Sequence, residues 1–277
     1  MRSYLSKTTA IAGMGLLWLV ALIEIYPILL VVISAVKSKP ELAANPFGLP
    51  KEVTFEFFKT AYNTMHYLQS VGNTILIATL SVAVSAAITS MAAYAIVRRK
   101  NRFHSFLYML FLAGMIIPFQ MTMIPLYKMM VDFGLYNSYH GIMMIYLALT
   151  APFSVFLLVG FIKSVPRELE EAALIDGCGI FQTFFRIVLP LLKPALTTLC
   201  VLNLFSVWND FLMPVLFLPD DKKMTITVQI SKFQGMYSND WSLLFAGICM
   251  IVLPMVVIYL LAQRFIINGI TAGAIKG

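Results

Sequence analysis

The sequence predicts an all-α membrane protein, because the chain is apolar throughout and its apolar segments are long. Of its 277 residues, 60% are hydrophobic and only 12% are charged, which is outside the range of a soluble globular domain. A helix needs roughly 20 residues to cross about 30 Å of hydrocarbon, whereas barrel strands are alternating segments of about ten residues. We expect residues 1–277 to form a single transmembrane domain with six helical spans, at about 10–36, 69–97, 105–127, 140–162, 195–218 and 242–263.

The distribution of positive charge predicts that both termini lie in the cytoplasm. Cytoplasmic loops of membrane proteins carry an excess of Lys and Arg. The seven Arg lie at the two ends of the chain and in the second and fourth loops between spans, most densely in the turn at residues 98–102, while eight Lys lie in the other loops. We therefore interpret the net charge of +7 as topology rather than as a sign of nucleic-acid binding.

The first span is too long for a cleaved signal peptide, whose apolar core would have about 7 to 15 residues, since it runs from Ala10 to Val36. Glu24 lies in its middle. A carboxylate at mid-bilayer costs about 2.5 to 3.5 kcal/mol, so a hydrogen-bonded structural role and a position on a water-filled route are both open for this residue.

The second span carries a narrow face of small side chains, and the other five spans carry proline. Ser81, Ser85, Thr89 and Ala93 recur at every fourth residue, and such faces let membrane helices pack closely; pore lining is the second interpretation. Proline removes a backbone donor and kinks a helix, which predicts bent spans at Pro27, Pro118 with Pro125, Pro152, Pro214 and Pro254.

The fifth span contains the polar side chains that are the candidates for a translocation path. These are Asn203, Trp208, Asn209 and Asp210. Intramembrane ionisable residues often face a water-filled route, but hydrogen bonding between helices explains these four residues equally well.

The loop at residues 163–194 is a polar interruption that predicts two short helices. Pro166 suits a first helical turn, and acidic residues follow it, which favours a helix N-terminus. Gly177 can adopt the left-handed conformation that ends such a helix. A second helix is expected up to Pro190, with one apolar face made of Phe181, Phe184, Phe185 and Val188. Amphipathic helices of this kind also lie on lipid headgroups.

The same loop matches a known pattern at every position: EAA, three residues, G, nine residues, I, any residue, LP. The matching residues are Glu171, Ala172, Ala173, Gly177, Ile187, Leu189 and Pro190. The chain thus resembles the inner-membrane permease subunits of ATP-binding-cassette (ABC) importers, which implies a type I importer permease with a cytoplasmic two-helix coupling loop. Further matches indicate the carbohydrate-uptake branch and subunits similar to the second maltose permease subunit: Ser34–Pro40, Asn73-Thr74, Pro118 with Pro125, Ser164–Leu169, Trp208–Leu212 and Thr271–Gly277.

The resemblance implies partners and residue roles. The partners are a second homologous permease subunit, an ATPase subunit dimer and an extracytoplasmic solute-binding protein, in the lipid of a bacterial inner membrane and without nucleic acid. The residues expected to couple to the ATPase are Glu171, Ala172, Ala173, Asp176 and Gly177. Glu171 is expected to form a charge-assisted contact with the ATPase, Ala172 and Ala173 to allow close approach, and Gly177 to form the turn.

The resemblance also assigns two further segments. The tail, with Thr271, Gly273 and Lys276, is expected to reach between the ATPase subunits, although composition alone predicts a frayed terminus. The loop at Pro219–Trp241 is either a solvated connector or a contact for the binding protein.

The sequence argues against an enzyme and against a cofactor of its own. It has no Gly-Lys dipeptide, so it has no phosphate-binding loop of the Walker type and a partner chain would bind the ATP. It has neither HExxH nor GxSxG, and its His and Cys lack the spacing of metal ligands or of a disulfide framework. The alternatives are a permease for a polyamine, phosphate or an amino acid, a self-sufficient channel or secondary transporter, and, more remotely, a membrane-embedded enzyme.

Overall fold

The computed structural model describes residues 7–99, 101–235 and 240–274, with the side chains of residues 12–99, 101–235 and 240–263. Within these ranges the regular structure is helical and contains no strand, which confirms the predicted all-helical class. The chain forms two compact units. One contains the residues up to 67 together with 229–254, and the other contains 68–228 together with the residues from 255 onward.

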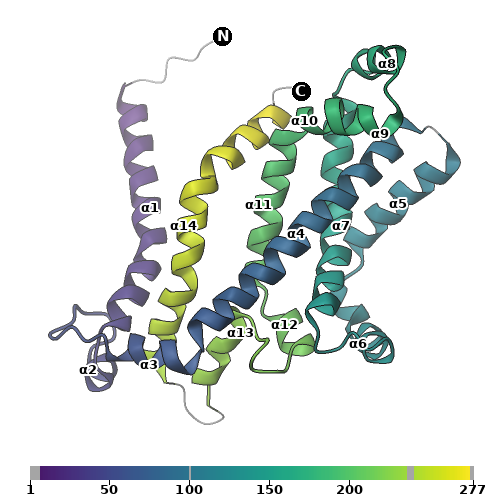
Figure 1. The fold of residues 1–277 in the computed structure, drawn as a ribbon. Coiled ribbons are helices and arrows are strands. Elements are labelled where there is room, and N and C mark those ends of the chain that lie inside the picture. The colour runs from purple at the N-terminus through teal and green to yellow at the C-terminus, as the bar shows by residue number, and fades with distance from the viewer. Residues whose placement is uncertain (1–6, 100, 236–239, 275–277) are drawn as a thin grey trace. The chain divides into compact units, whose positions relative to one another are not determined.

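Figure 1 labels the helices in chain order. The first unit contains α1 (Lys7–Ala35), α2 (Lys39–Ala44), α3 (Glu56–Thr64), the 3-10 helix η3 (Ile230–Phe233) and the first part of α14 (Trp241–Ala274). The second unit contains α4 (Tyr67–Arg98), α5 (Arg102–Ile116), η1 (Phe119–Thr122), α6 (Met123–Asp132), α7 (Tyr139–Lys163), α8 (Glu168–Ile175), α9 (Ile180–Thr183), η2 (Phe184–Val188), α10 (Leu189–Leu191), α11 (Lys193–Asn209) and α12 (Leu212–Phe217). The short helix α13 (Ile226–Gln229) lies where the two units meet in the sequence.

Among the described residues, four helices are long and apolar enough to cross a membrane without interruption: Ala12–Ala35, Tyr67–Arg98, Tyr139–Lys163 and Trp241–Gln263. The expected span at 105–127 is not one helix, because α5 and the η1–α6 segment meet at 98°. Pro118 explains the bend. The residue before a proline is driven out of the helical region, and Ile117 is extended, with φ −72° and ψ 119°.

The expected span at 195–218 is also interrupted. The helix α11 ends at Asn209, and Asp210 adopts an extended conformation with ψ 126° before α12 begins. A proline ring crowds the carbonyl group four residues earlier. Because Pro214 would crowd the carbonyl of Asp210 in a continuous helix, the chain leaves the helical conformation at that residue.

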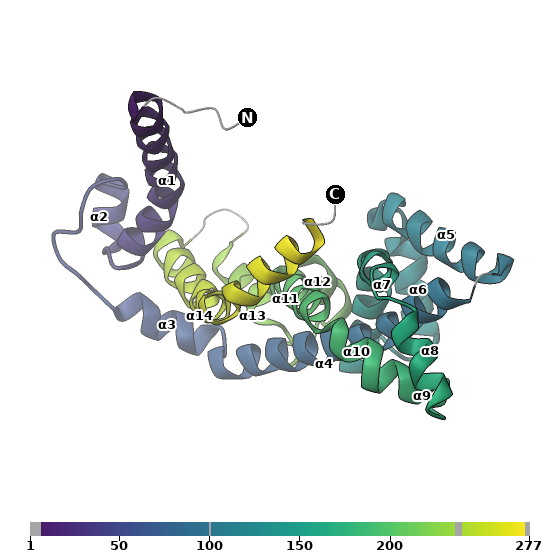
Figure 2. The same ribbon diagram turned by 90° about the horizontal axis from the view of Figure 1, so that it is seen from above.

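The small-residue face of α4 packs inside the second unit. Ser81, Ser85, Thr89 and Ala93 are all at most 3% exposed. The Ser85 hydroxyl lies 2.8 Å from the hydroxyl of Thr150 on α7, so the two helices share a hydrogen bond. Close packing, the first interpretation of this face, is confirmed. On another side, α7 packs against α5, and Figure 2 shows these two helices side by side.

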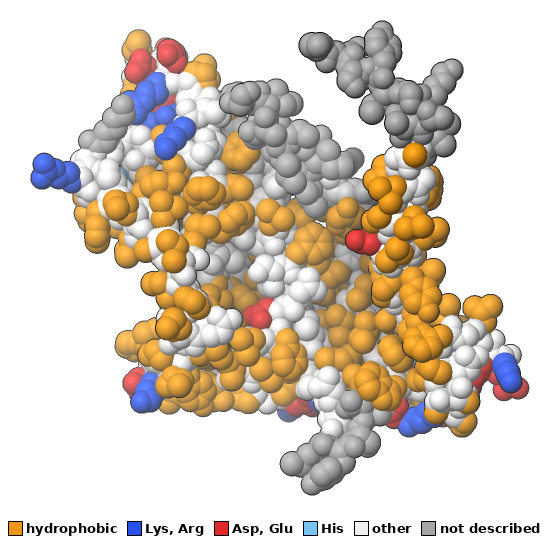
Figure 3. All heavy atoms as spheres, turned by 180° about the vertical axis from the view of Figure 1, so that it is seen from behind, with side chains coloured by type: hydrophobic (Ala, Val, Ile, Leu, Met, Phe, Trp, Pro, Cys, Tyr) orange, Lys and Arg blue, Asp and Glu red, His pale blue; other side chains and the backbone are white. Residues whose placement is uncertain are grey.

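The lateral surfaces of the helices are apolar, as a bilayer requires. In the space-filling view, hydrophobic side chains cover most of the visible helix surface, and charged side chains gather mainly near helix ends (Figure 3). In the most apolar 18-residue stretch of α1, none of the residues is buried within the chain. Large exposed side chains such as Leu17 and Trp18 are therefore available to lipid or to another protein.

Replacing Ser85 with leucine should destabilise the protein more than the same change at an exposed site of the same helix. Overpacking a filled interior costs about 1 to 3 kcal/mol, and Ser85 is fully buried whereas Thr79 is exposed and bonds only within α4. We expect Ser85→Leu to lower the thermal unfolding midpoint of the purified protein in detergent, and Thr79→Leu to leave it near the wild-type value. Equal midpoints for both variants would contradict the packing interpretation.

Candidate functional site

The candidate site is the coupling loop at residues 163–194, which lies at the Arg98 end of α4 (Figure 1). Its first helix, α8, has Glu168, Glu170 and Glu171 in its first turn. Acidic side chains at this position are stabilised by the partial positive charge of the helix N-terminus. The local sequence therefore fixes where α8 begins.

Gly177 ends α8 in the way that the sequence predicts. Its φ is +84°, in the left-handed region where glycine avoids the penalty of about 1 to 2 kcal/mol that other residues incur. The amide of Cys178 donates to the Ala173 carbonyl at 2.9 Å, and the amide of Gly177 donates to the Leu174 carbonyl at 3.1 Å. This pair of bonds is the Schellman arrangement, which turns the chain sharply after one short helix.

The second helix of the loop departs from the prediction, because its apolar side chains do not share one face. Phe184 and Val188 are at most 2% exposed, while Phe181 is 74% and Phe185 is 52% exposed. Residues Phe184–Val188 form a π-helical turn, which has more residues per turn than an α-helix. One pair therefore packs into the unit, and the other pair stays on the surface of the loop.

A buried ion pair attaches the coupling loop to α4. Arg98 donates from Nε to Glu170 Oε1 at 2.7 Å, and its Nη2 lies 2.5 Å from the same oxygen. The hydroxyl of Tyr94 donates to Glu170 Oε2 at 2.9 Å. Arg98 also donates from Nη2 to the Val165 carbonyl at 3.1 Å. We refer to Tyr94, Arg98 and Glu170 as the Glu170 cluster; it joins the first turn of α8 to the last turn of α4.

Aromatic packing extends this attachment to the second part of the loop. The rings of Tyr94 and Phe184 have centroids 5.1 Å apart. A groove of about 480 Å³ opens beside the cluster, lined by side chains that include Arg99, Arg167, Glu171 and Phe181. The rim of this groove thus combines charged groups with an exposed aromatic ring.

The predicted contact residues of the loop divide between its surface and its interior. Glu171, Ala172, Asp176 and Gly177 are exposed. Within the part of the chain that the structure describes, the Glu171 carboxylate has no hydrogen-bond or ion-pair partner. Ala173, in contrast, is 4% exposed, so its small side chain serves packing between the loop and its own unit.

The candidate path residues form contacts within the second unit. Asn203 is 5% exposed and donates to Ser154 Oγ at 3.2 Å, which joins α11 to α7. The Asp210 carboxylate accepts from the Tyr146 hydroxyl and from the amide of Leu212, both at 2.9 Å. Trp208 is 1% exposed, and only Asn209 is exposed. The contacts of Asn203 and Asp210 favour the helix-packing interpretation for both; a role in the path stays a prediction.

The predicted tail residues fall at the limit of the described structure. Thr271 and Gly273 belong to α14, which continues to Ala274, and Lys276 lies outside the described residues. The backbone at Thr271 is thus helical, where composition predicts a frayed terminus.

Sequence reasoning missed the Glu170 cluster. It assigned Glu170 only to the helix N-terminus and Arg98 only to the positive cytoplasmic charge. The two residues are 72 positions apart, and nothing in the spacing of one sequence links them. Paired substitutions among related chains are the signal that would have linked them.

Long apolar helices with the charged coupling loop at one end are the architecture of a membrane-embedded subunit that contacts a soluble partner. The chain belongs to the family described as the binding-protein-dependent transport system inner membrane component, whose model matches residues 85–266.

Relatives match nearly the whole chain. The probable starch degradation products transport system permease protein AmyC of Thermoanaerobacterium thermosulfurigenes is 37% identical, over 92% of this chain and 93% of the relative. The melibiose/raffinose/stachyose import permease protein MelC of Bacillus subtilis is 36% identical, over 94% of both chains. The multiple sugar-binding transport system permease protein MsmG of Streptococcus mutans is 35% identical, over 90% of this chain and 91% of the relative.

Solved structures share the fold. A chain in the crystal structure of a bacterial ABC transporter that imports the acidic polysaccharide alginate superposes with a TM-score of 0.83 at 24% identity, covering 95% of this chain and 99% of that one. A chain of the alginate transporter in complex with its pentasaccharide-bound periplasmic protein gives 0.68 at 17% identity, covering 92% and 93%. The type I permease fold expected from the sequence is therefore confirmed.

The losses of stability caused by removing Arg98 and by removing Glu170 should not add, because each single change leaves the other charge buried and unpaired. Leaving one charge of a buried pair unpaired costs about 3 to 5 kcal/mol, and the side chains of Arg98 and Glu170 are 13% and 9% exposed. We expect Arg98→Ala and Glu170→Ala each to lower the unfolding midpoint in detergent, and the double variant to be more stable than the sum predicts. The matched control Glu171→Ala, at an exposed carboxylate, should stay within about 0.5 kcal/mol of wild type. Strict additivity would contradict the pairing.

Proposed function

We propose that the chain is a permease subunit of an ATP-driven, binding-protein-dependent oligosaccharide importer. The observation that carries this proposal is the coupling loop: its sequence pattern folds into an exposed lever that a buried ion pair attaches to the long helix α4. A surface that projects charge and aromatic rings beyond the apolar helices is suited to contact a soluble partner. The family description supplies the transport role.

The solute class follows from the relatives. Three relatives at 35 to 37% identity carry names for starch degradation products, for melibiose, raffinose and stachyose, and for multiple sugars. These names share oligosaccharide chemistry but not one sugar. The proposal therefore stops at the class. A permease for a polyamine, phosphate or an amino acid is the alternative within the family.

Hydrolysis of ATP takes place on a separate ATPase, which docks on the coupling loop. Glu171 is exposed and unpaired within the described chain, so it can form a charge-assisted hydrogen bond with a partner at little desolvation cost within its own chain. Exposed Phe181 lines the same groove as Glu171 and adds apolar area to this surface. Docking on this surface would displace the lever, and the Glu170 cluster would transmit the displacement to α4.

A second permease subunit completes the path, and α1 supports this part of the proposal. Glu24 is exposed in the middle of α1, and the most apolar window of that helix has no buried residue. In lipid this carboxylate would cost about 2.5 to 3.5 kcal/mol, and contact with another protein that offers hydrogen-bond donors would lower the cost.

In the proposed orientation in the membrane, the coupling loop, both termini and the Arg98 end of α4 lie in the cytoplasm. In support, the structure joins the second and fourth loops at one end of the second unit, through the bond from Arg98 to the Val165 carbonyl. These loops carry most of the arginines. The tail around Thr271 and Gly273 would reach the ATPases from the same side.

The transport proposal is tested by reconstitution of the complete assembly, with both permeases, the ATPase and the binding protein, in lipid vesicles. We expect uptake of at least one radiolabelled oligosaccharide from a panel, with a strict requirement for ATP on the side of the ATPase and for the binding protein. Polyamines, phosphate and amino acids in the same assay are the controls for the solute class. Solute uptake by the purified chain alone would contradict the proposal and favour a secondary transporter.

The coupling surface is tested by cross-linking to the purified ATPase partner. In a background with Cys178→Ser, which removes the native thiol of the loop, a cysteine introduced by Ala172→Cys should cross-link efficiently because residue 172 is exposed beside Glu171. The control Ser105→Cys lies at an exposed position in the first turn of α5, outside the coupling loop, and should react at least several-fold less. Equal yields at the two positions would favour a loop that lies on lipid headgroups instead.

A further inference from the structure

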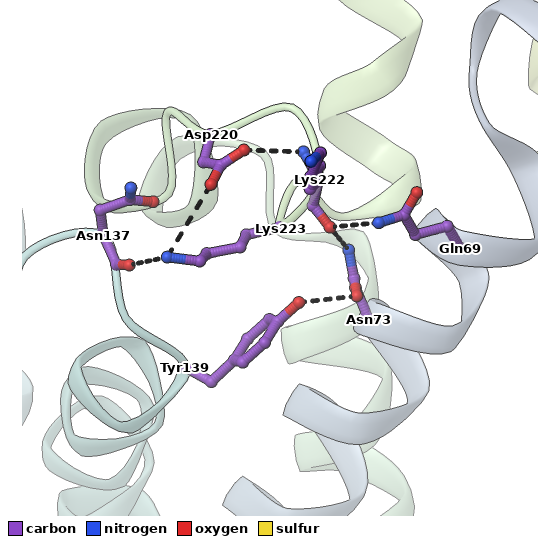
Figure 4. Close-up of polar contacts among 7 residues, drawn as sticks. All are labelled: Gln69, Asn73, Asn137, Tyr139, Asp220, Lys222 and Lys223. Carbon is purple, nitrogen blue, oxygen red and sulfur yellow. Dashed lines mark hydrogen bonds and ion pairs between the residues drawn. The ribbon is translucent and has the colours of Figure 1, made fainter.

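The end of α4 opposite to Arg98 holds a second buried polar cluster, which the transport mechanism above does not use. Its centre is Asn73, which is 8% exposed and was noted in the sequence only as part of an Asn73-Thr74 match. Figure 4 shows the Asn73 side chain between Tyr139 and the backbone that follows α12. A buried amide at this position calls for an explanation, since polar groups are buried at a cost unless they are hydrogen-bonded.

The amide of Asn73 is satisfied in a way that fixes its orientation. Its Nδ2 donates to the carbonyls of Lys222 at 2.9 Å and of Met224 at 3.0 Å, and its Oδ1 accepts from the Tyr139 hydroxyl at 2.9 Å. A side-chain amide has two donor hydrogens, and both are used here. One side chain of α4 thus substitutes for the backbone partners that residues 222 and 224 would have in a regular element.

Neighbouring residues complete the attachment of this segment. The Thr74 hydroxyl, 1% exposed, accepts from the amide of Ile226 at 2.9 Å. Gln69 donates to the Lys222 carbonyl at 2.9 Å. On the other side, Lys223 donates from Nζ to the Asn137 carbonyl at 2.7 Å. The segment is therefore held by α4 and by the start of α7 together, and all of these residues belong to the second unit.

The held segment is itself a preformed turn. The amides of Lys223 and Met224 donate to the Asp220 carbonyl at 2.8 and 3.1 Å, and the Asp220 carboxylate accepts from the Lys222 amide at 3.0 Å. A side-chain bond of this kind stabilises a turn without any regular element. Asp221 and the Lys222 side chain are exposed at its tip, so the turn presents a charged pair to solvent while its backbone is fixed.

We propose that Asn73 is a positioning residue that holds the 220–224 turn ready to dock the solute-binding protein. This inference rests on the proposed function, which places the turn outside the cell. A preformed loop binds more tightly than a mobile one, because the ordering cost is met in folding rather than in association. Charged groups at its tip suit a soluble protein partner, whose approach complementary charges accelerate. Loss of the Asn73 bonds leaves the partner's docking element unfixed without removing any group that touches the partner.

The test uses the complete reconstituted transporter and measures ATP hydrolysis against the concentration of binding protein. For Asn73→Ala we expect the half-maximal concentration of binding protein to rise about tenfold, equivalent to about 1.4 kcal/mol, with the hydrolysis rate at saturation within about twofold of wild type. Tyr139→Phe, which removes only the hydroxyl bound to Asn73 Oδ1, should raise it by a smaller factor. The matched control Thr79→Ala, on the exposed face of the same helix, should leave it unchanged.

An unchanged half-maximal concentration in Asn73→Ala would overturn the inference, whether or not the saturated rate falls; a lower saturated rate alone is the pattern of a merely structural residue. If Asn73→Ala does not assemble, Tyr139→Phe decides by the same criterion. Failure of the proposed function itself looks different, because the wild-type assembly would then show no stimulation of hydrolysis by any concentration of binding protein.

Discussion

The carboxylate of Glu170 is a buried charge, and the groups that neutralise it determine how the coupling loop is attached. Arg98 and Tyr94 come from the last two turns of α4, and they meet Glu170 in the first turn of α8. A short helix of this kind has little intrinsic stability. Its position depends on this ion pair, on the turn at Gly177 and on the packing of Phe184. The exposed face of the loop, with Glu171, can serve a partner because the opposite face is fixed.

In the second unit, a few polar contacts determine how the apolar helices pack against one another. Apolar side chains are available on every helix, so packing alone gives little specificity between helices. Polar contacts supply it at a few places: Ser85 with Thr150, Asn203 with Ser154, and Tyr146 with Asp210. Each pair joins α7 to α4, to α11 or to the break that follows α11. These bonds set which faces of the helices meet.

The sequence predicts the parts of this structure that depend on local chemistry. The left-handed glycine at 177, the small face of α4 and the long apolar helices follow from residue type and spacing alone. It does not predict which of three neighbouring glutamates faces inward, because that depends on how α8 docks. It also does not predict which prolines break a span. Pro27, Pro152 and Pro254 stay inside continuous helices, whereas Pro118 ends one, and only the surrounding packing decides between these outcomes. Asp210 was open to two interpretations for the same reason: its partner Tyr146 is remote in sequence.

The uninterrupted helix α4 has a mechanical consequence. The 25 residue steps from Asn73 to Arg98 correspond to about 38 Å, which exceeds the hydrocarbon thickness, and no proline interrupts them. Polar contacts hold this helix near both of its ends, in contrast to α5 and the η1–α6 segment, which meet at a 98° bend. If α4 tilts as a rigid body, a displacement of one end is accompanied by a displacement of the other end. The two anchored ends could then move together without side-chain rearrangements along the helix.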